Sequence, residues 1–196
     1  NFAIDKGCGT YEDPYQIEDA RQLLALARYL QNKNDYKYLG GWKIHAFESG
    51  RTGGQVCDGT VHTEDNLIKY PDNGTAALPP DFPTQEQLGR AYYMIVKDID
   101  FSAMKNGTDR QIAEDFLGLG TENMPFRGVI IGKKQDDGSY PVITLPFRRC
   151  WTDSTANVNH GLIQYAKGAV VKDLEIRGAG TETGDMDAAG TRTGVV

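Results

Sequence analysis

After residue 90 the chain consists of short apolar stretches separated by glycines and polar turns, and this pattern most constrains its fold. The candidate strands are 92–96, 98–101, 126–131 and 141–145. Residues 170–176 alternate between apolar and polar side chains, as a strand with one buried face does. The start Gly161-Leu162-Ile163 recurs as Gly194-Val195-Val196. Short segments with a repeated glycine-apolar start favour a β-solenoid, and a sandwich of short strands is the competing architecture.

One amphipathic helix is predicted ahead of this β-rich part. Leu23, Leu26 and Leu30 recur at three- and four-residue steps, which places them on one apolar face. Glu18 or Asp19 supplies a carboxylate that can accept hydrogen bonds from the free N–H groups at the helix start. We therefore place a helix at 19–32, with the three leucines as structural residues.

Residues 33–90 show little regular periodicity. Aromatic residues stand among glycines and prolines, and a segment of this length without regular structure is uncommon in a compact domain. We interpret it as an irregular insertion with a short hairpin around 41–48 and a helical turn that starts at Thr84. Asn73 and Asn106, each followed by Gly-Thr, are interpreted as Asn-Gly turns.

Composition and charge exclude some classes of protein. The 196 residues are 39% hydrophobic and 10% aromatic, which is too apolar for a disordered chain. No run approaches the roughly 20 apolar residues that span a bilayer. The net charge is -6 and the basic residues are scattered, whereas a nucleic-acid binder needs a basic face. We expect neither a membrane span in this segment nor a nucleic-acid partner.

The cysteines leave the redox state open. Cys8, Cys57 and Cys150 are three in number, so at least one of them has no partner within the chain. No pair has the spacing of a metal site. One disulfide with a free thiol and a fully reduced chain both fit the sequence, and it does not choose among the three pairings.

Several segments occur in the order found in a family of bacterial surface proteins. The segments are 7–10 (Gly-Cys-Gly-Thr), 12–17 (Glu-Asp-Pro-Tyr-Gln-Ile), 22–27, 97–102, 125–128, 161–165 and 168–176. Together they resemble bacterial cell-surface β-helix proteins with GLUG-type repeats, which include adhesins and share a pectate-lyase-like solenoid. The resemblance covers about 1–32 and 92–196. Two positions depart from it, because Gln164 and the run 132–134 stand where the family has glycine-containing turns.

This resemblance implies a mainly β fold. We expect a right-handed parallel β-helix with an N-terminal capping helix and a long irregular insertion. The domains are then a cap at 1–32, the insertion at 33–90, and the first rungs at 91–196. An amphipathic helix before the first strand would cover the unpaired edge of that rung. We expect the rungs to continue beyond residue 196, or the edge at 194–196 to self-associate, because no capping repeat follows.

Aromatic residues are the candidate ligand-binding residues. Aromatic rings can stack on the apolar faces of sugars, although rings beneath a long loop more often fill a small core. The candidates are Tyr36, Tyr38, Trp42, Phe47 and Trp151.

Two pairs of acids are candidates for chemistry. Asp98 and Asp100 share one side of a predicted strand, where they could bind Ca²⁺ or act as acid and base. The alternative, which we favour, is that they bind turn N–H groups at a strand end as structural residues. Asp185 and Asp187 lie in a glycine-rich loop with Glu182, so Ca²⁺ is the one cofactor that the chain suggests, although a solvated loop explains them as well.

Together these features predict an extracellular bacterial surface module for display or adhesion that binds a glycan or a partner protein and has no catalytic residues. The alternative is a polysaccharide-active β-helix enzyme, a lyase or a glycosidase. A groove with three or more acids and a Lys or Arg would favour the enzyme.

Overall fold

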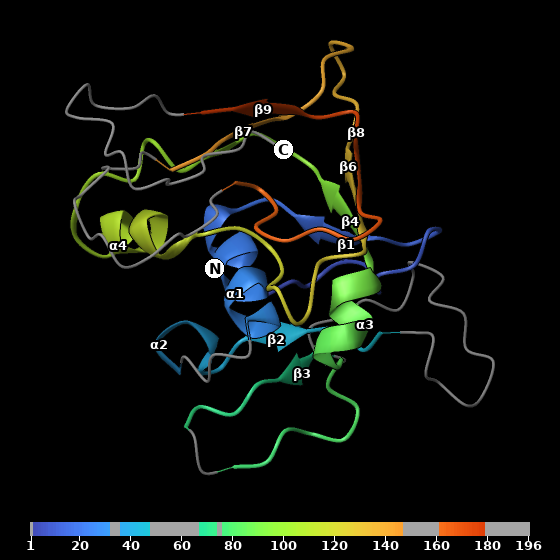
Figure 1. The fold of residues 1–196 in the computed structure, drawn as a ribbon, viewed down its shortest axis with the longest axis vertical. Helices are drawn as coiled ribbons and strands as arrows, with labels where there is room; N and C mark the ends of the chain where they lie inside the picture. Colours follow the sequence, from blue (N-terminus) through green and yellow to red (C-terminus); the bar gives the residue numbers. More distant parts are fainter. Residues whose placement is uncertain (1, 32–35, 48–66, 74–75, 147–160, 179–196) are drawn as a thin grey trace.

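Two parallel sheets, four helices and one antiparallel strand pair make up the part of the chain described by the computed structural model (Figure 1). It describes residues 2–31, 36–47, 67–73, 76–146 and 161–178. The strands are β1 (Tyr15–Ile17), β2 (Lys43–Ile44), β3 (Ile68–Lys69), β4 (Tyr92–Ile95), β5 (Ile99–Asp100), β6 (Val129–Gly132), β7 (Val142–Thr144), β8 (Val170–Lys172) and β9 (Glu175–Arg177). The helices are α1 (Ala20–Leu30), α2 (Tyr36–Leu39), α3 (Gln85–Arg90) and α4 (Gly107–Asp115).

The parallel strands form a four-stranded sheet in the order β1-β4-β6-β8 and a three-stranded sheet in the order β5-β7-β9. The chain passes from the first sheet to the second three times, at β4 to β5, β6 to β7 and β8 to β9. The register places Tyr15 beside Tyr93 and Tyr93 beside Ile130, so inward-facing side chains form a row across the sheet. β2 and β3 form the separate antiparallel pair.

α1 confirms the predicted helix, which starts where a capping box forms. The Asp19 carboxylate accepts a hydrogen bond from the Arg21 N–H at 2.7 Å, and the Gln22 side chain accepts one from the Asp19 N–H at 3.1 Å. Leu23, Leu26 and Leu30 are buried, but so is most of the helix, since Arg21 and Arg28 are its only residues that are not. The helix is therefore enclosed rather than one-sided.

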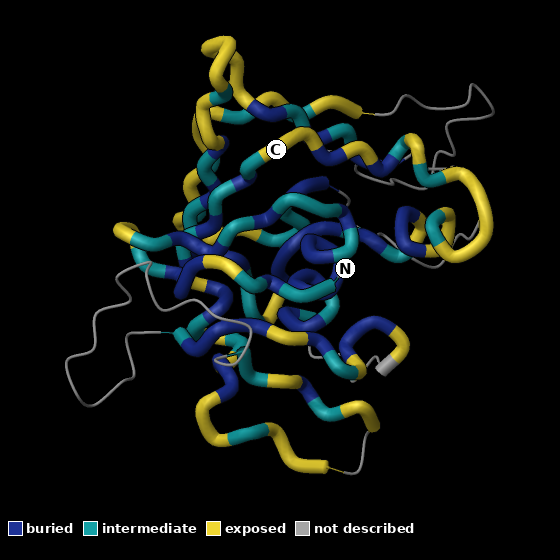
Figure 2. Tube along the Cα trace, turned by 180° about the vertical axis from the view of Figure 1, so that it is seen from behind, coloured by how far each residue is buried: buried dark blue, intermediate teal, exposed yellow. Residues whose placement is uncertain are grey.

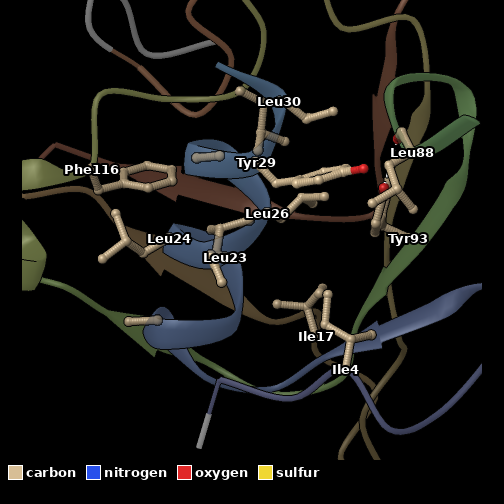
Figure 3. Packing of buried hydrophobic residues seen from close by; sticks show 14 of the residues in the cluster. Ile4, Ile17, Leu23, Leu24, Leu26, Tyr29, Leu30, Leu88, Tyr93 and Phe116 are labelled. Atoms are coloured by element: carbon tan, nitrogen blue, oxygen red, sulfur yellow. Dashed lines mark hydrogen bonds between the residues drawn. The ribbon is translucent and has the colours of Figure 1, made fainter. Parts of the chain in front are cut away.

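The core gathers around α1. Side chains of α1 pack with Ile4, Ile17 and Tyr93 from the strand side and with Leu88 and Phe116 from other segments (Figure 3). The buried chain segments run through the centre of the molecule, and exposed segments lie around it (Figure 2). α1 contacts α2, α3 and α4, so helices as well as strands surround it.

The structure corrects the predicted fold class. The chain forms a small α/β protein with parallel sheets and four helices in the described residues, and its sheets are not stacked as a right-handed β-helix. A solenoid fills its interior with side chains from successive coils. Here the interior is filled largely by α1 and by buried aromatic residues such as Trp42, Tyr70 and Phe82. α1 is thus a central element and not a cap on the end of a solenoid.

Several predicted elements occur close to their expected places. β4, β5 and β7 fall within the predicted strands, and β6 overlaps the strand predicted at 126–131. α3 begins after Thr84, whose side chain accepts a hydrogen bond from the Gln87 N–H at 3.1 Å. The predicted strand at 170–176 is two strands, because Asp173 between them has a φ of 55° that turns the chain. The strand paired with β2 comes from residues 68–69, rather than from a hairpin within 41–48.

The loop at residues 7–9 has a steric requirement for glycine. Gly7 has a φ of +81°, and a Cβ atom there would lie 1.9 Å from the Pro14 carbonyl oxygen. The N–H groups of Cys8 and Gly9 both donate to the Asp13 carbonyl, at 3.0 and 3.1 Å. Cys8 is buried and disulfide-bonded, and the partner cysteine lies outside the described residues. The loop therefore places a disulfide directly beside β1.

Candidate functional site

A small cavity lies where the N-terminal segment runs beside β2. The Ile4 N–H donates to the Lys43 carbonyl at 2.8 Å, and Ile4 forms an isolated parallel β-bridge with Ile44. Both isoleucines are buried, so they anchor the segment to the core. The cavity, here called the N-terminal pocket, has a volume of about 300 Å³. It is lined by Phe2, Ala3, Asp5, Gly40, Gly41, Trp42, Lys43 and Leu67.

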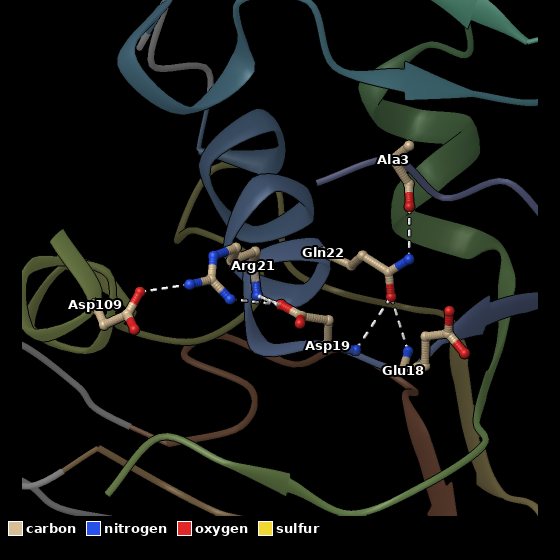
Figure 4. Close-up of polar contacts among 6 residues, drawn as sticks. All are labelled: Ala3, Glu18, Asp19, Arg21, Gln22 and Asp109. Carbon is tan, nitrogen blue, oxygen red and sulfur yellow. Dashed lines mark hydrogen bonds and ion pairs between the residues drawn. The ribbon is translucent and has the colours of Figure 1, made fainter. Parts of the chain in front are cut away.

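Gln22 of α1 fixes one wall of the pocket. Its side-chain amide donates to the Ala3 carbonyl at 2.5 Å, and its side-chain oxygen accepts from the Glu18 N–H at 2.8 Å and from the Asp19 N–H (Figure 4). The side chain is buried, and its oxygen binds the Glu18 and Asp19 N–H groups at the helix start, which have no partner within the helix itself. The position of the N-terminal segment thus depends on the same residue that caps α1.

Trp42 lines the pocket and belongs to a cluster of aromatic rings. The aromatic cluster consists of Tyr29, Trp42, Tyr70 and Phe82, all of them buried. Neighbouring ring centroids in it lie 5.5–6.0 Å apart with mostly edge-on geometry, the arrangement that aromatic pairs prefer. The backbone N–H of Trp42 donates to the Leu39 carbonyl at 2.8 Å, and the backbone carbonyl of Trp42 accepts from the Tyr70 N–H at 2.6 Å. The part of the pocket lining that Trp42 provides is therefore held by ring packing and by backbone hydrogen bonds.

Asp5 and Lys43 give the pocket its polar character. Within the described ranges neither side chain has an ion-pair partner, whereas Lys69, which lies across from Lys43 in the β2–β3 pair, is bound to Asp72 at 2.6 Å. The backbone at Asp5 is held as well, since its carbonyl lies 2.9 Å from Nε2 of the buried His45. The pocket thus combines one carboxylate and one ammonium group with the half-buried side chains of Phe2 and Leu67.

The predicted aromatic ligand residues are dispersed. Tyr38 and Trp42 are buried, so their faces are not open to a sugar ring, and Phe47 is half-buried against the core. Trp42 is the member of this set that lines the pocket. Tyr36 begins α2, but its side chain and Trp151 lie outside the described residues.

The predicted acid pair is occupied by hydrogen bonds to nearby N–H and O–H groups. One Asp98 oxygen accepts from the Val142 N–H at 2.8 Å. One Asp100 oxygen accepts from the Ser102 N–H at 2.8 Å and from the Ser102 hydroxyl at 2.6 Å. Asp100 thus makes the local contacts expected of Asp in a turn, whereas Asp98 links the segment after β4 to the first residue of β7.

The metal prediction falls on Asp185 and Asp187, which lie outside the described residues. Within the part of the chain that is described, no group of three or more His, Cys, Asp or Glu side chains is arranged to hold a metal ion. None of the helices in that part is both long enough and apolar enough to cross a membrane.

Comparisons with protein-family models, with curated protein sequences and with solved structures each returned no match for this chain.

Three buried tyrosines predict alkaline sensitivity. Burial raises the pKa of Tyr15, Tyr29 and Tyr93, with smaller contributions from Asp13, Tyr70 and Tyr15 respectively. Their hydroxyls donate to the carbonyls of His45, Pro83 and Leu88 at 2.6–2.8 Å. Because the pKa of each tyrosine is higher in the folded state, its contribution to stability is complete below the unfolded-state pKa near 10. This contribution is lost as the pH rises above that value.

We therefore expect the free energy of unfolding to fall steeply above about pH 10, by about 1.4 kcal/mol per pH unit for each buried tyrosine. Urea unfolding followed by circular dichroism between pH 8 and 11 measures this. Tyr93→Phe removes one ionising group and should reduce the slope. An unfolding free energy that does not change between pH 8 and 11 would show that these hydroxyls are not held in the neutral form.

Proposed function

We propose that the chain is a non-catalytic extracellular module for display or adhesion on a bacterial surface, and that its N-terminal pocket binds a glycan. The observation that carries this proposal is the presence of Asp5 and Lys43 in the lining of one pocket together with apolar residues, where neither charge has an ion-pair partner among the described residues. Ligand sites commonly combine an apolar lining with a few polar groups that fix orientation.

The two charged groups complement the hydroxyls of a sugar. The Asp5 carboxylate can accept hydrogen bonds from neighbouring hydroxyls, and the Lys43 ammonium can donate to hydroxyl or carboxylate oxygens. Phe2 and Leu67 offer apolar contact for the C–H face of the ring. The volume of about 300 Å³ sets the scale of the ligand at a small part of an oligosaccharide, such as one or two sugar units.

The disulfide at Cys8 supports an extracellular location, because disulfides persist in oxidising compartments. Placement on a bacterial surface rests on the resemblance of the segments 7–10 and 12–17 to surface proteins. A Ca²⁺ site at Asp185 and Asp187, a surface protein as the partner, and self-association at 194–196 stay predictions, since the metal residues and 194–196 lie outside the described residues.

A glycan array combined with a reducing-end assay tests the proposal. We expect the protein to bind a limited set of oligosaccharides and to release no new reducing ends from them. Release of reducing ends or unsaturated products would support the polysaccharide-active enzyme instead. The absence of binding to any glycan on the array would contradict the glycan proposal and favour a protein partner.

A further inference from the structure

Among the described residues, β9 is the last strand of the three-stranded sheet, and its outer edge has no strand beside it. The Glu175 N–H donates to the Pro141 carbonyl at 3.1 Å, and the Arg177 carbonyl accepts from the Leu145 N–H at 2.8 Å. These groups face β7. Because backbone groups alternate along a strand, the N–H and carbonyl of Ile176 face away from β7. No described residue pairs with them, and β9 lies at the outer side of the sheet (Figure 1).

The side chains of β9 are arranged symmetrically about Ile176. Ile176 is half-buried and packs against the core, whereas Glu175 and Arg177 are exposed on the other face. Glu175 and Arg177 form an ion pair with each other at 2.5 Å, and more than half of each side chain is exposed. An acid and a base on the same face therefore flank an apolar residue whose backbone has no partner among the described residues.

We propose that this edge pairs with the same edge of a second copy of the chain, in antiparallel orientation and centred on Ile176. In that arrangement each Ile176 N–H donates to the carbonyl of the other copy's Ile176. Residues directly opposite one another in an antiparallel pair share a face. Each Glu175 then lies opposite the Arg177 of the other copy, so two separate ion pairs become a group of four alternating charges.

Charge complementarity selects a second copy over an arbitrary strand. A two-fold contact brings the same surface of two copies together. The strand must therefore be complementary to the same strand running in the opposite direction. The order Glu-Ile-Arg satisfies this condition, since reversal places the acid opposite the base. An open edge otherwise invites unspecific pairing, and charges beside it restrict which strands can bind. The strand has three residues, so we expect a weak, concentration-dependent dimer.

Sedimentation velocity from micromolar to millimolar concentration tests this inference. We expect the wild type to dimerise reversibly. Glu175→Arg places Arg opposite Arg, and Arg177→Glu places Glu opposite Glu, so each should weaken dimerisation at least about tenfold. A mixture of the two single variants should form a mixed dimer, and the double exchange Glu175→Arg with Arg177→Glu should dimerise like the wild type.

The same exchange at the exposed ion pair Arg110–Glu114 of α4 is the matched control, and it should leave dimerisation unchanged. Recovery in the mixture also shows that the single variants are folded. A wild type that stays monomeric at millimolar concentration overturns the proposal and indicates that another segment of the chain or another protein occupies the edge. Unaltered dimerisation in both single variants, or no mixed dimer, overturns it as well.

Discussion

Replacement of Trp42 by alanine is expected to lower the free energy of unfolding by about 3–5 kcal/mol. The ring is 1% exposed and its centroid lies 5.6 Å from that of Tyr29 and 5.8 Å from that of Phe82. Removal of the ring leaves a cavity beside Tyr29 of α1 and Phe82. These neighbours have few ways to fill it because they are held by backbone hydrogen bonds.

The substitution Trp42→Phe distinguishes the contribution of ring packing to stability from that of the indole N–H group. The Trp42 Nε1 atom is buried and has no hydrogen-bond partner among the described residues, so its loss removes an unsatisfied donor while much of the ring contact remains. We expect less than about half of the alanine effect. Urea unfolding by circular dichroism measures both variants, and equal losses would contradict the packing that we describe.

Leu26→Ala is expected to lower the free energy of unfolding by about 2–5 kcal/mol. Leu26 is fully buried on the helix around which the core is built. Leu78 provides a matched control, because the same substitution there removes the same atoms from a side chain that is 44% exposed. We expect Leu78→Ala to change stability by no more than about 0.5 kcal/mol. Similar effects at the two positions would refute the central place of α1.

Local sequence patterns predicted the elements whose apolar residues follow a simple pattern along the chain. The leucine spacing and Asp19 located α1 to within two residues of its ends, and short apolar stretches between glycines and polar turns located β4 and β7. α4 was missed because it has few apolar residues and because Asn106, which precedes its first residue, was interpreted as a turn. Alternation also continued through Asp173, where a positive φ separates β8 from β9 without interrupting the pattern.

The predicted β-helix was wrong because the fold class depends on packing between segments that are distant in the sequence. Parallel pairing of short glycine-punctuated strands was a correct expectation, but a glycine-apolar repeat does not reveal what fills the space beside the sheets. That space is occupied by α1, whose apolar residues surround nearly the whole helix, and by rings from residues 42, 70 and 82. Trp42, one of the candidate sugar-binding residues, packs against Tyr29 in the interior, as do Tyr70 and Phe82.

The pocket could not be predicted from the sequence because its parts are distant in the chain. Asp5 and Lys43 come together through the pairing of Ile4 with Ile44, and Gln22 holds the wall from a third segment. No spacing rule connects these residues. The one local signal nearby was the carboxylate of Glu18 or Asp19 at the helix start, and it does not indicate a binding site.

The most direct test of the binding site is calorimetric titration with the oligosaccharide that binds best on the array. The wild type is compared with the double variant Asp5→Asn, Lys43→Gln. A double variant at the exposed turn between β6 and β7, Asp136→Asn with Lys134→Gln, carries the same chemical changes away from the pocket (Figure 1). Loss of charged hydrogen bonds predicts at least about a tenfold weaker affinity for the pocket variant, with wild-type affinity in the turn variant. Equal affinity in all three proteins, with unchanged melting temperatures, would contradict a glycan site between Asp5 and Lys43.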